Sequence, residues 1–175
     1  MKYLLLGLTL VALTLTSFII GLSKDPRKIP SNLIDSVIPN FDLDYIGSGI
    51  NHFTKEDLLK IKNIKIVNVF ASWCPPCKIE HPQISKLSEK YLMFGINQKD
   101  KQENLFNWLE ELGNPYEGIG LDKEGRASIE WGVYGVPETF ILDSNSKIRY
   151  KHVGPIMERD LKVFEEVINL LKNEN

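Results

Sequence analysis

The chain has 175 residues, of which 43% are hydrophobic and 25% are charged, the balance of an ordinary globular protein rather than a disordered one. Its formal net charge is -2 at pH 7, so no basic surface is available to hold nucleic acid by charge. Two cysteines are too few for a disulfide-dense scaffold or for a zinc site of four thiolates. We therefore expect one domain whose function is neither nucleic-acid binding nor a cysteine-rich structural role.

The first segment, residues 3–22, carries no charge and lies between Lys2 and Lys24. A helix of that length reaches about 30 Å, the thickness of the hydrocarbon core of a bilayer. A cleaved secretory signal has a shorter apolar region, of about 7–15 residues, and small residues at its cleavage site. No clear site of that kind follows Leu22, so we predict an uncleaved signal-anchor over residues 1–22, with a cleaved signal as the alternative.

Basic residues flank this segment on both sides, so the positive-inside rule leaves its orientation open. Residues 23–40 contain Pro26, Pro30 and Pro39 among polar residues, and we expect them to form a tether. The soluble domain is then predicted over residues 41–172.

The soluble part begins with segments typical of a strand, a helix and a second strand. Hydrophobic residues alternate with polar ones at Phe41, Leu43 and Tyr45, which predicts a half-buried strand. A short helix is expected from Thr54, whose hydroxyl suits an N-cap. The run IKIVNVFA at residues 64–71 is rich in β-branched and aromatic residues and predicts a buried central strand.

Cys74 opens the next predicted helix, which is expected to run to about Tyr91. Pro75 and Pro76 suit its first turn, where backbone amides have no partner within the helix, and Pro82 is expected to kink it. The later elements are, in chain order, a strand at 92–96, a helix with the apolar face Leu105, Trp108, Leu109 and Leu112, a hairpin of 138–142 with 148–150, and a closing helix over 161–171. Strands joined by helical crossovers pair in parallel, so this order predicts an α/β sheet flanked by helices.

Both cysteines lie in the sequence Trp73-Cys74-Pro75-Pro76-Cys77, at the junction of the central strand and the helix. A helix N-terminus stabilises an anion, so the pKa of Cys74 is expected to lie below the free-thiol value of about 8.5. We expect Cys74 to be the exposed nucleophile and Cys77, one turn along, to be the buried thiol that resolves a mixed disulfide. The pair therefore predicts two-electron thiol–disulfide exchange.

Other uses of a C-x-x-C pair fit the sequence less well. A zinc site could add His81, but no fourth ligand is placed by the sequence. Attachment of a c-type haem needs a histidine directly after the second cysteine, where Lys78 stands. A permanent structural disulfide over so short a separation closes almost no loop and adds little stability.

The motifs around the cysteines resemble a known family. Residues 69–77 (VFASWCPPC) and 135–137 (GVP) resemble the active site and the cis-proline loop of the thioredoxin superfamily. Five segments resemble the CcmG/DsbE family, which consists of membrane-anchored thiol:disulfide interchange proteins of cytochrome c maturation. These segments are residues 73–81 (WCPPCKIEH), 95–100 (GINQKD), 108–116 (WLEELGNPY), 132–143 (GVYGVPETFILD) and 148–154 (IRYKHVG). This resemblance spans roughly residues 36–172 and implies a thioredoxin fold, with a central mixed sheet flanked by helices.

The resemblance also implies a location and a reaction. It implies a single-pass anchor in the inner membrane, a periplasmic domain, and a redox-active Cys74–Cys77 disulfide that works without metal or cofactor. Electrons would come from a membrane thiol transporter of the DsbD/CcdA type and go to the C-x-x-C-H cysteines of apocytochrome c, directly or through the partner CcmH, for haem attachment. A general extracytoplasmic disulfide reductase or oxidase and a copper-binding assembly chaperone of thioredoxin fold remain as alternatives.

Two polar residues, Asn68 and Glu80, are candidates for tuning the thiols. Asn68 stands six residues before Cys74, where ordinary thioredoxins have a buried aspartate, and an amide cannot accept the proton of Cys77. The alternative for Asn68 is a strand residue whose hydrogen bonds are satisfied and which has no role in tuning the thiols. Glu80 lies one helical turn beyond Cys77 and matches an acid of the family motif, although most helix glutamates are merely solvated. A nearby carboxylate raises the pKa of a thiol, whereas the helix N-terminus lowers it.

Other residues are candidates for a groove that binds the partner. Pro137 is expected to be in cis, which exposes the backbone of Val136 to an extended peptide. Glu138 matches the Pro-Glu of the family motif and is expected to place a carboxylate beside the thiols. Tyr134 is expected near the groove, with plain core packing as the alternative. Trp73 is expected to cover the sulfur of the first cysteine and to offer apolar area to a partner.

Overall fold

The structure is a computed structural model that describes residues 2–22, 32–47 and 49–174. Helix α1 (Lys2–Leu22) is long and apolar enough to cross a membrane, and all its described side chains are exposed. Its hydroxyl groups donate hydrogen bonds to backbone carbonyls three or four residues earlier, at Thr9, Thr14, Thr16 and Ser17. These hydroxyls are paired within the helix and therefore suit an apolar surrounding. A signal sequence has the same length and composition, so the anchor stays a prediction.

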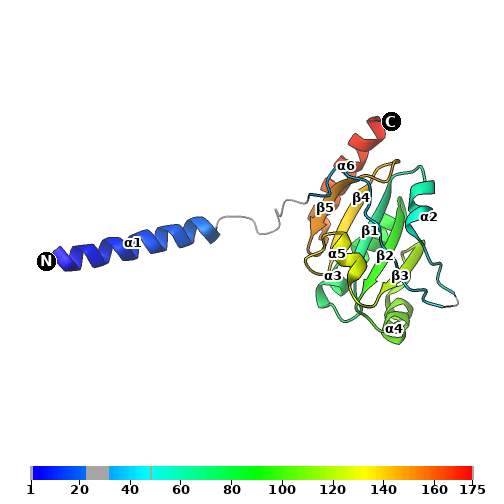
Figure 1. Cartoon of the computed structure of the whole chain (residues 1–175), viewed down its shortest axis with the longest axis horizontal. Helices are drawn as coiled ribbons and strands as arrows, with labels where there is room; N and C mark the ends of the chain where they lie inside the picture. Colours follow the sequence, from blue (N-terminus) through cyan, green and yellow to red (C-terminus); the bar gives the residue numbers. More distant parts are fainter. Residues whose placement is uncertain (1, 23–31, 48, 175) are drawn as a thin grey trace.

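A five-stranded sheet forms the centre of the domain (Figure 1). Its strands are β1 (Lys65–Phe70), β2 (Leu92–Gln98), β3 (Gly118–Asp122), β4 (Glu138–Leu142) and β5 (Ile148–Val153), in the spatial order β3-β2-β1-β4-β5. β1 pairs in parallel with β2, and β2 with β3, whereas β4 runs antiparallel to both β1 and β5. This mixed sheet with helices on both faces is the thioredoxin-like fold that the sequence predicted.

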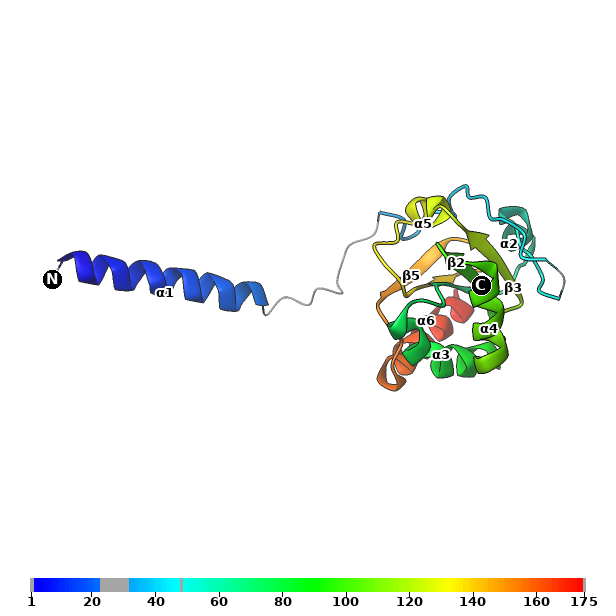
Figure 2. The same cartoon turned by 90° about the horizontal axis from the view of Figure 1, so that it is seen from below.

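Helices cover both faces of the sheet (Figure 2). On one face lie α3 (Pro75–Ser88), α4 (Gln102–Leu112) and α6 (Leu161–Asn173), the last preceded by the 3-10 turn η1 (Glu158–Asp160). On the other face lie α2 (Lys55–Lys60) and α5 (Arg126–Glu130). Because successive strand residues point to opposite faces, Ile66 and Phe70 of β1 pack in the core with α3, α4 and α6, and Val67 and Val69 pack in the other core.

The elements next to the cysteines confirm the sequence analysis. β1 is buried along its whole length, and α3 follows Cys74, which is its N-cap. Pro82 lies inside α3 without ending it, and the helix stops at Ser88, a little before the expected end. The predicted hairpin is present, and the Asp143 carboxylate accepts hydrogen bonds from backbone N–H groups in its turn.

The segment predicted as a strand over Phe41–Tyr45 makes only one β-bridge, between Asp44 and Leu121. Tyr45 is exposed rather than half-buried. The chain crosses β3 closely here, because a Cβ at Gly120 would lie 2.5 Å from Cδ1 of Leu43. Leu43 thus packs against the backbone of Gly120 at the sheet edge. The segment makes this side-chain contact with β3 and does not pair with it as a continuous strand.

β3 and α5 were not expected from the sequence. β3 reads Gly-Ile-Gly-Leu-Asp, whose glycines interrupt any run of β-forming residues. α5 has only five residues, and its first turn is held by the Asp122 carboxylate, which accepts hydrogen bonds from the backbone N–H groups of Ala127 and Ser128. Elements this short show no periodicity that a sequence pattern could reveal.

The packed domain begins earlier than the sequence analysis placed it. Residues 23–31 of the expected tether lie outside the described residues. Val37 forms a β-bridge with Lys147, and the backbone N–H of Ile38 donates to the carbonyl of Ser146. The side chain of Ile38 is buried. The end of the expected tether is therefore part of the domain, because it packs on the β4–β5 turn.

Candidate active site

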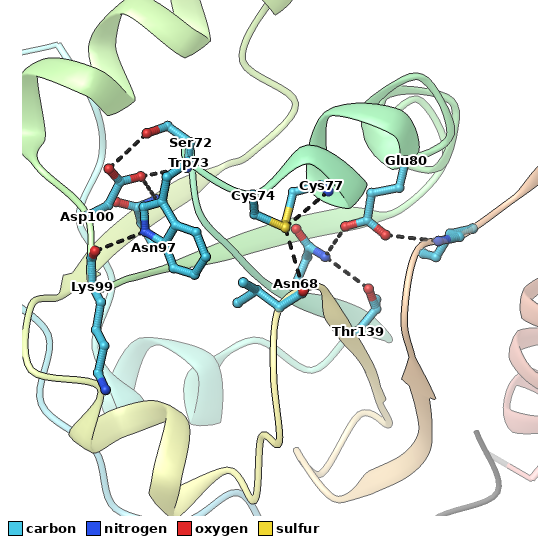
Figure 3. Close-up of a disulfide and its surroundings, with 12 residues drawn as sticks. Asn68, Ser72, Trp73, Cys74, Cys77, Glu80, Asn97, Lys99, Asp100 and Thr139 are labelled. Carbon is cyan, nitrogen blue, oxygen red and sulfur yellow. Dashed lines mark hydrogen bonds between the residues drawn. A yellow bond between two sulfur atoms is a disulfide. The ribbon is translucent and has the colours of Figure 1, made fainter. Parts of the chain in front are cut away.

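Cys74 and Cys77 form a disulfide at the N-terminus of α3 (Figure 3). Sγ of Cys74 accepts a hydrogen bond from the backbone N–H of Cys77 at 3.2 Å. Pro75 and Pro76 occupy the start of the helix, where missing backbone donors leave no hydrogen bond unmade. The Cys74 sulfur therefore lies where a helix N-terminus stabilises a thiolate.

Both cysteines are nearly buried in this oxidised state, Cys74 at 3% and Cys77 at 1% exposure. The expectation of an exposed Cys74 is wrong for the disulfide form. The cover comes from a distant loop, because Sγ of Cys74 lies 3.5 Å from the carbonyl oxygen of Val136. A partner must therefore reach the sulfur beside this loop.

The loop that covers Cys74 contains a cis peptide bond between Val136 and Pro137, as the resemblance implied. The carbonyl of Pro137 accepts a hydrogen bond from the backbone N–H of Gly154, which ties the loop to the end of β5. Tyr134 is 68% exposed, so its core-packing alternative is wrong. The backbone of Val136 thus lies next to the disulfide, and an exposed aromatic side chain stands two residues earlier in the same loop.

Glu80 lies on the buried side of α3 and is 1% exposed. Its Oε1 accepts a hydrogen bond from Nδ2 of Asn68 at 3.0 Å, and its Oε2 accepts one from the backbone N–H of Ile156 at 2.9 Å. Burial raises the pKa of Glu80 to about 7, against these two hydrogen bonds, which lower it. A carboxyl that titrates near neutral pH, one turn beyond Cys77, can exchange protons under physiological conditions.

Asn68 is fully buried and connects Glu80 to two further side chains, of which Figure 3 draws Thr139. Its Nδ2 also donates to Oγ1 of Thr139 at 3.0 Å, and its Oδ1 accepts a hydrogen bond from the hydroxyl of Tyr116 at 2.8 Å. The side-chain amide is therefore held on both sides, and one of its N–H groups is directed at the Glu80 carboxylate. Tyr116 and Thr139 were not predicted from the sequence, because no local spacing links them to the cysteines.

Glu138 does not lie beside the thiols, which corrects the sequence analysis. It stands opposite Val69 in the β1–β4 pair, so its side chain points to the sheet face away from α3. Its Oε1 accepts a hydrogen bond from the backbone N–H of Tyr134 at 2.9 Å, and its Oε2 pairs with Nζ of Lys151 at 2.9 Å. Strand alternation therefore puts neighbouring residues Glu138 and Thr139 into different surroundings.

Lys151 supports the cis-proline loop from the sheet face opposite α3. Its side chain is 3% exposed, and its Nζ donates to the carbonyl of Gly132 at 2.6 Å as well as pairing with Glu138. The same ammonium lies 4.6 Å from the centroid of the Tyr134 ring. The buried ion pair thus holds the backbone at Gly132 and Tyr134, the residues that lead into the segment covering Cys74.

Residues 97–100 hold the other side of the site (Figure 3). The Asp100 carboxylate accepts hydrogen bonds from the backbone N–H of Ser72 at 2.6 Å and from its hydroxyl at 2.8 Å. Nε1 of Trp73 donates to the carbonyl of Lys99 at 2.9 Å, and the side chain remains 54% exposed. The apolar area expected of Trp73 is therefore available to a partner. Asp100 and Lys99 were not singled out from the sequence as site residues.

The histidine considered for a metal site is placed elsewhere. His81 is buried, its Nε2 lies 3.1 Å from the carbonyl oxygen of Leu112, and its ring stacks edge-on against Trp108. Burial lowers the pKa of His81. In the part of the chain that the structure describes, no group of three or more His, Cys, Asp or Glu is arranged to hold a metal ion.

Comparisons with known proteins agree with this geometry. The family described as Redoxin matches residues 34–168. The thiol:disulfide interchange protein DsbE of Allochromatium vinosum is 41% identical over 150 residues, which cover 85% of this chain and 80% of that protein. The DsbE protein of Escherichia coli is 38% identical over 148 residues, covering 84% and 78%. The crystal structure of a DsbF homologue from Corynebacterium diphtheriae matches the fold with a TM-score of 0.64 at 20% identity, covering 85% and 95%.

Proposed function

Because this chain belongs to the Redoxin family and, within it, to the DsbE thiol:disulfide interchange proteins, we propose that it reduces the cysteines to which haem is attached in cytochrome c maturation. It is a thiol:disulfide oxidoreductase, and Cys74 and Cys77 are its redox pair. The observation that carries the proposal is the position of this pair, at a helix N-terminus and against the cis Val136–Pro137 loop.

The reaction is dithiol–disulfide exchange in two steps. The Cys74 thiolate attacks one sulfur of the substrate disulfide, which forms a mixed disulfide and releases the other substrate sulfur as a thiolate. Cys77 then loses its proton and attacks the Cys74 sulfur, which releases the second substrate sulfur and closes the Cys74–Cys77 disulfide. The substrate gains two electrons and two protons, and this protein is oxidised.

Glu80 accepts the proton that Cys77 loses in the second step. Its carboxyl is buried on the same helix as Cys77, and its pKa of about 7 lets it hold or release a proton near neutral pH. Asn68 stands near the thiols but cannot play this part, since an amide does not accept a proton at this pH. Asn68 instead donates a hydrogen bond to the ionised carboxylate.

The substrate peptide binds in an extended form beside the cis-proline loop. The backbone of Val136 pairs with it, and the exposed rings of Trp73 and Tyr134 contact its apolar side chains. Glu138 is bound to Lys151 on the other face of the sheet, so it positions the loop and does not contact the peptide. This role replaces the direct charge selection that the sequence analysis expected of Glu138.

The proposed location is the inner membrane, with α1 as a single-pass anchor and the domain in the periplasm. The length and composition of α1 support this placement. Electrons then come from a membrane thiol transporter of the DsbD/CcdA type and leave to apocytochrome c or to CcmH. The full-length protein should remain in the membrane pellet after carbonate extraction. Recovery of a soluble mature form that starts near Ser23 would favour a cleaved signal.

A trapping experiment tests the proposed substrate. Reduced full-length Cys77→Ser protein in detergent is incubated with an oxidised C-x-x-C-H peptide, and a mixed disulfide through Cys74 is expected. The matched Cys74→Ser variant should trap little. The intact protein should reduce this peptide faster than it reduces insulin. Insulin reduction at the rate of an ordinary thioredoxin would favour a general disulfide reductase, and a strongly oxidising potential of the pair would reverse the proposed direction of electron flow.

A further inference from the structure

We propose that Tyr116 is a positioning residue for Glu80: its hydroxyl fixes the side-chain amide of Asn68 with the N–H donors directed at the carboxylate. The inference rests on the proposed function only in assuming that Glu80 accepts the proton of Cys77. The orientation of the Asn68 amide is a property of the site itself and can be tested separately.

A buried asparagine can in principle be placed in two orientations, which exchange its oxygen and its nitrogen. In this structure Oδ1 of Asn68 faces the Tyr116 hydroxyl at 2.8 Å, and Nδ2 faces Oε1 of Glu80 and Oγ1 of Thr139, both at 3.0 Å. The flipped orientation would place Oδ1 against the ionised carboxylate, where two acceptors would meet. The observed orientation therefore favours the ionised form of Glu80.

The Tyr116 hydroxyl disfavours the flipped orientation. A flipped Asn68 would turn its N–H groups toward this hydroxyl, whose own proton would then lose its acceptor. Within the described residues, the structure gives the hydroxyl no partner other than Asn68. A buried donor without an acceptor is costly, so the tyrosine stabilises one amide orientation.

The Tyr116 ring cannot easily turn its hydroxyl elsewhere. It is 7% exposed and stacks on Phe70, with ring centroids 4.9 Å apart. Its other neighbour is the bare backbone of β2, since a Cβ at Gly95 would lie 3.2 Å from Cγ of the ring. The ring thus packs against both an aromatic side chain and a glycine, which restricts its movement and keeps the hydroxyl beside Asn68.

The Glu80 carboxylate depends on these neutral donors. Its recorded partners are Asn68 and the backbone N–H of Ile156, and no lysine or arginine pairs with it in the described part of the chain. The titratable side chains on the elements packed around it on this side of the sheet include Cys77 and His81 of α3, Tyr116 before β3, Tyr150 and His152 of β5, and Asp160 of η1. Loss of one donor orientation should therefore change the titration of Glu80 measurably.

The test follows the Glu80 carboxyl by 13C NMR in the oxidised full-length protein in detergent, in which the cysteines do not titrate. The resonance is identified by its absence in Glu80→Gln. We expect Tyr116→Phe to raise the pH midpoint of this resonance by about half a pH unit or more, because the amide is then free to flip. Thr139→Val, which removes the acceptor of the second Asn68 N–H, should shift the midpoint in the same direction. Tyr91→Phe removes the same atom from a tyrosine that lies under Lys172 and should leave the midpoint unchanged.

A double-variant comparison separates positioning from general loosening of the site. In an Asn68→Ala background, Tyr116→Phe should add no further shift, because the amide through which it acts is gone. An unchanged midpoint in folded Tyr116→Phe would overturn the proposal, and so would a shift that persists in the Asn68→Ala background. If Tyr116→Phe does not fold, the wild-type protein decides: NMR cross-peaks from the Asn68 side-chain NH2 to the Thr139 side chain are expected, and cross-peaks to the Tyr116 hydroxyl side of the ring instead would overturn the proposal. Failure of the proposed proton transfer would show differently, as peptide reduction by Glu80→Gln at the wild-type rate and pH profile.

Discussion

Two buried glutamates support the redox site, and the structure compensates their charges in different ways. Glu80 is 1% exposed on the α3 face of the sheet and accepts hydrogen bonds from the neutral donors Asn68 and Ile156. Glu138 is 0% exposed on the opposite face and pairs with the ammonium of Lys151 at 2.9 Å. The two carboxyls therefore belong to the same site but not to the same chemistry.

The difference shows how the partner decides the role of a buried acid. Neutral donors only partly offset the cost of burying a charge, so the pKa of Glu80 rises to about 7 and its proton can come and go. A close cation compensates the charge where it stands, and the Glu138–Lys151 pair then serves to hold the Gly132–Pro137 loop. The first arrangement suits proton transfer, and the second suits fixed geometry.

Lys151→Met tests most directly whether a cation compensates the buried charge of Glu138. The substitution leaves Glu138 buried without its cation, which typically costs about 3–5 kcal/mol of the free energy of unfolding. Denaturant unfolding of the full-length protein in detergent would measure the loss. The double variant with Glu138→Met should recover much of the stability, since an apolar pair can replace a buried ion pair. A loss below about 1 kcal/mol in the single variant would show that the pair does not support the fold.

A second prediction concerns the pH dependence of stability through Glu80. Its pKa is about 7 in the folded protein against 4.5 without the surrounding structure, so the folded state binds the proton more tightly. The stabilisation is fully present below pH 4.5 and is lost as the pH rises through 7, by about 3 kcal/mol in total. Unfolding of Glu80→Gln over the same pH range is the control, and its profile should lack this contribution. Equal slopes in the two proteins would contradict the raised pKa.

The smallest expected effect comes from an ion pair of the same type at the surface. Lys86 and Glu158 lie 2.6 Å apart, but their side chains are 52% and 70% exposed. Lys86→Ala should change the free energy of unfolding by about 1 kcal/mol or less, and salt should reduce the difference further. A loss comparable with that of Lys151→Met would show that pairing, rather than burial, determines the cost.

Much of the fold could be predicted from the sequence because its signals are local. The central strand appears as a continuous run of β-forming residues, and the prolines and Cys74 mark the start of α3. The hairpin is indicated by the turn residues that follow Leu142. The redox pair was also predictable, since both cysteines lie within one motif. β3 could not be predicted from its sequence. Its glycines are required by close packing against Leu43 and other residues that are distant along the chain.

The sequence by itself therefore determined the order of the main elements and the chemistry of Cys74 and Cys77. The surroundings of these cysteines follow from contacts between distant parts of the chain: the loop over Cys74, the burial of Glu80 and the pairing of Glu138 with Lys151. The sequence pattern treats the two glutamates alike, as acids next to motif residues. Their roles differ because sheet topology places them on opposite faces, and because a pKa depends on burial and on partners far away along the chain.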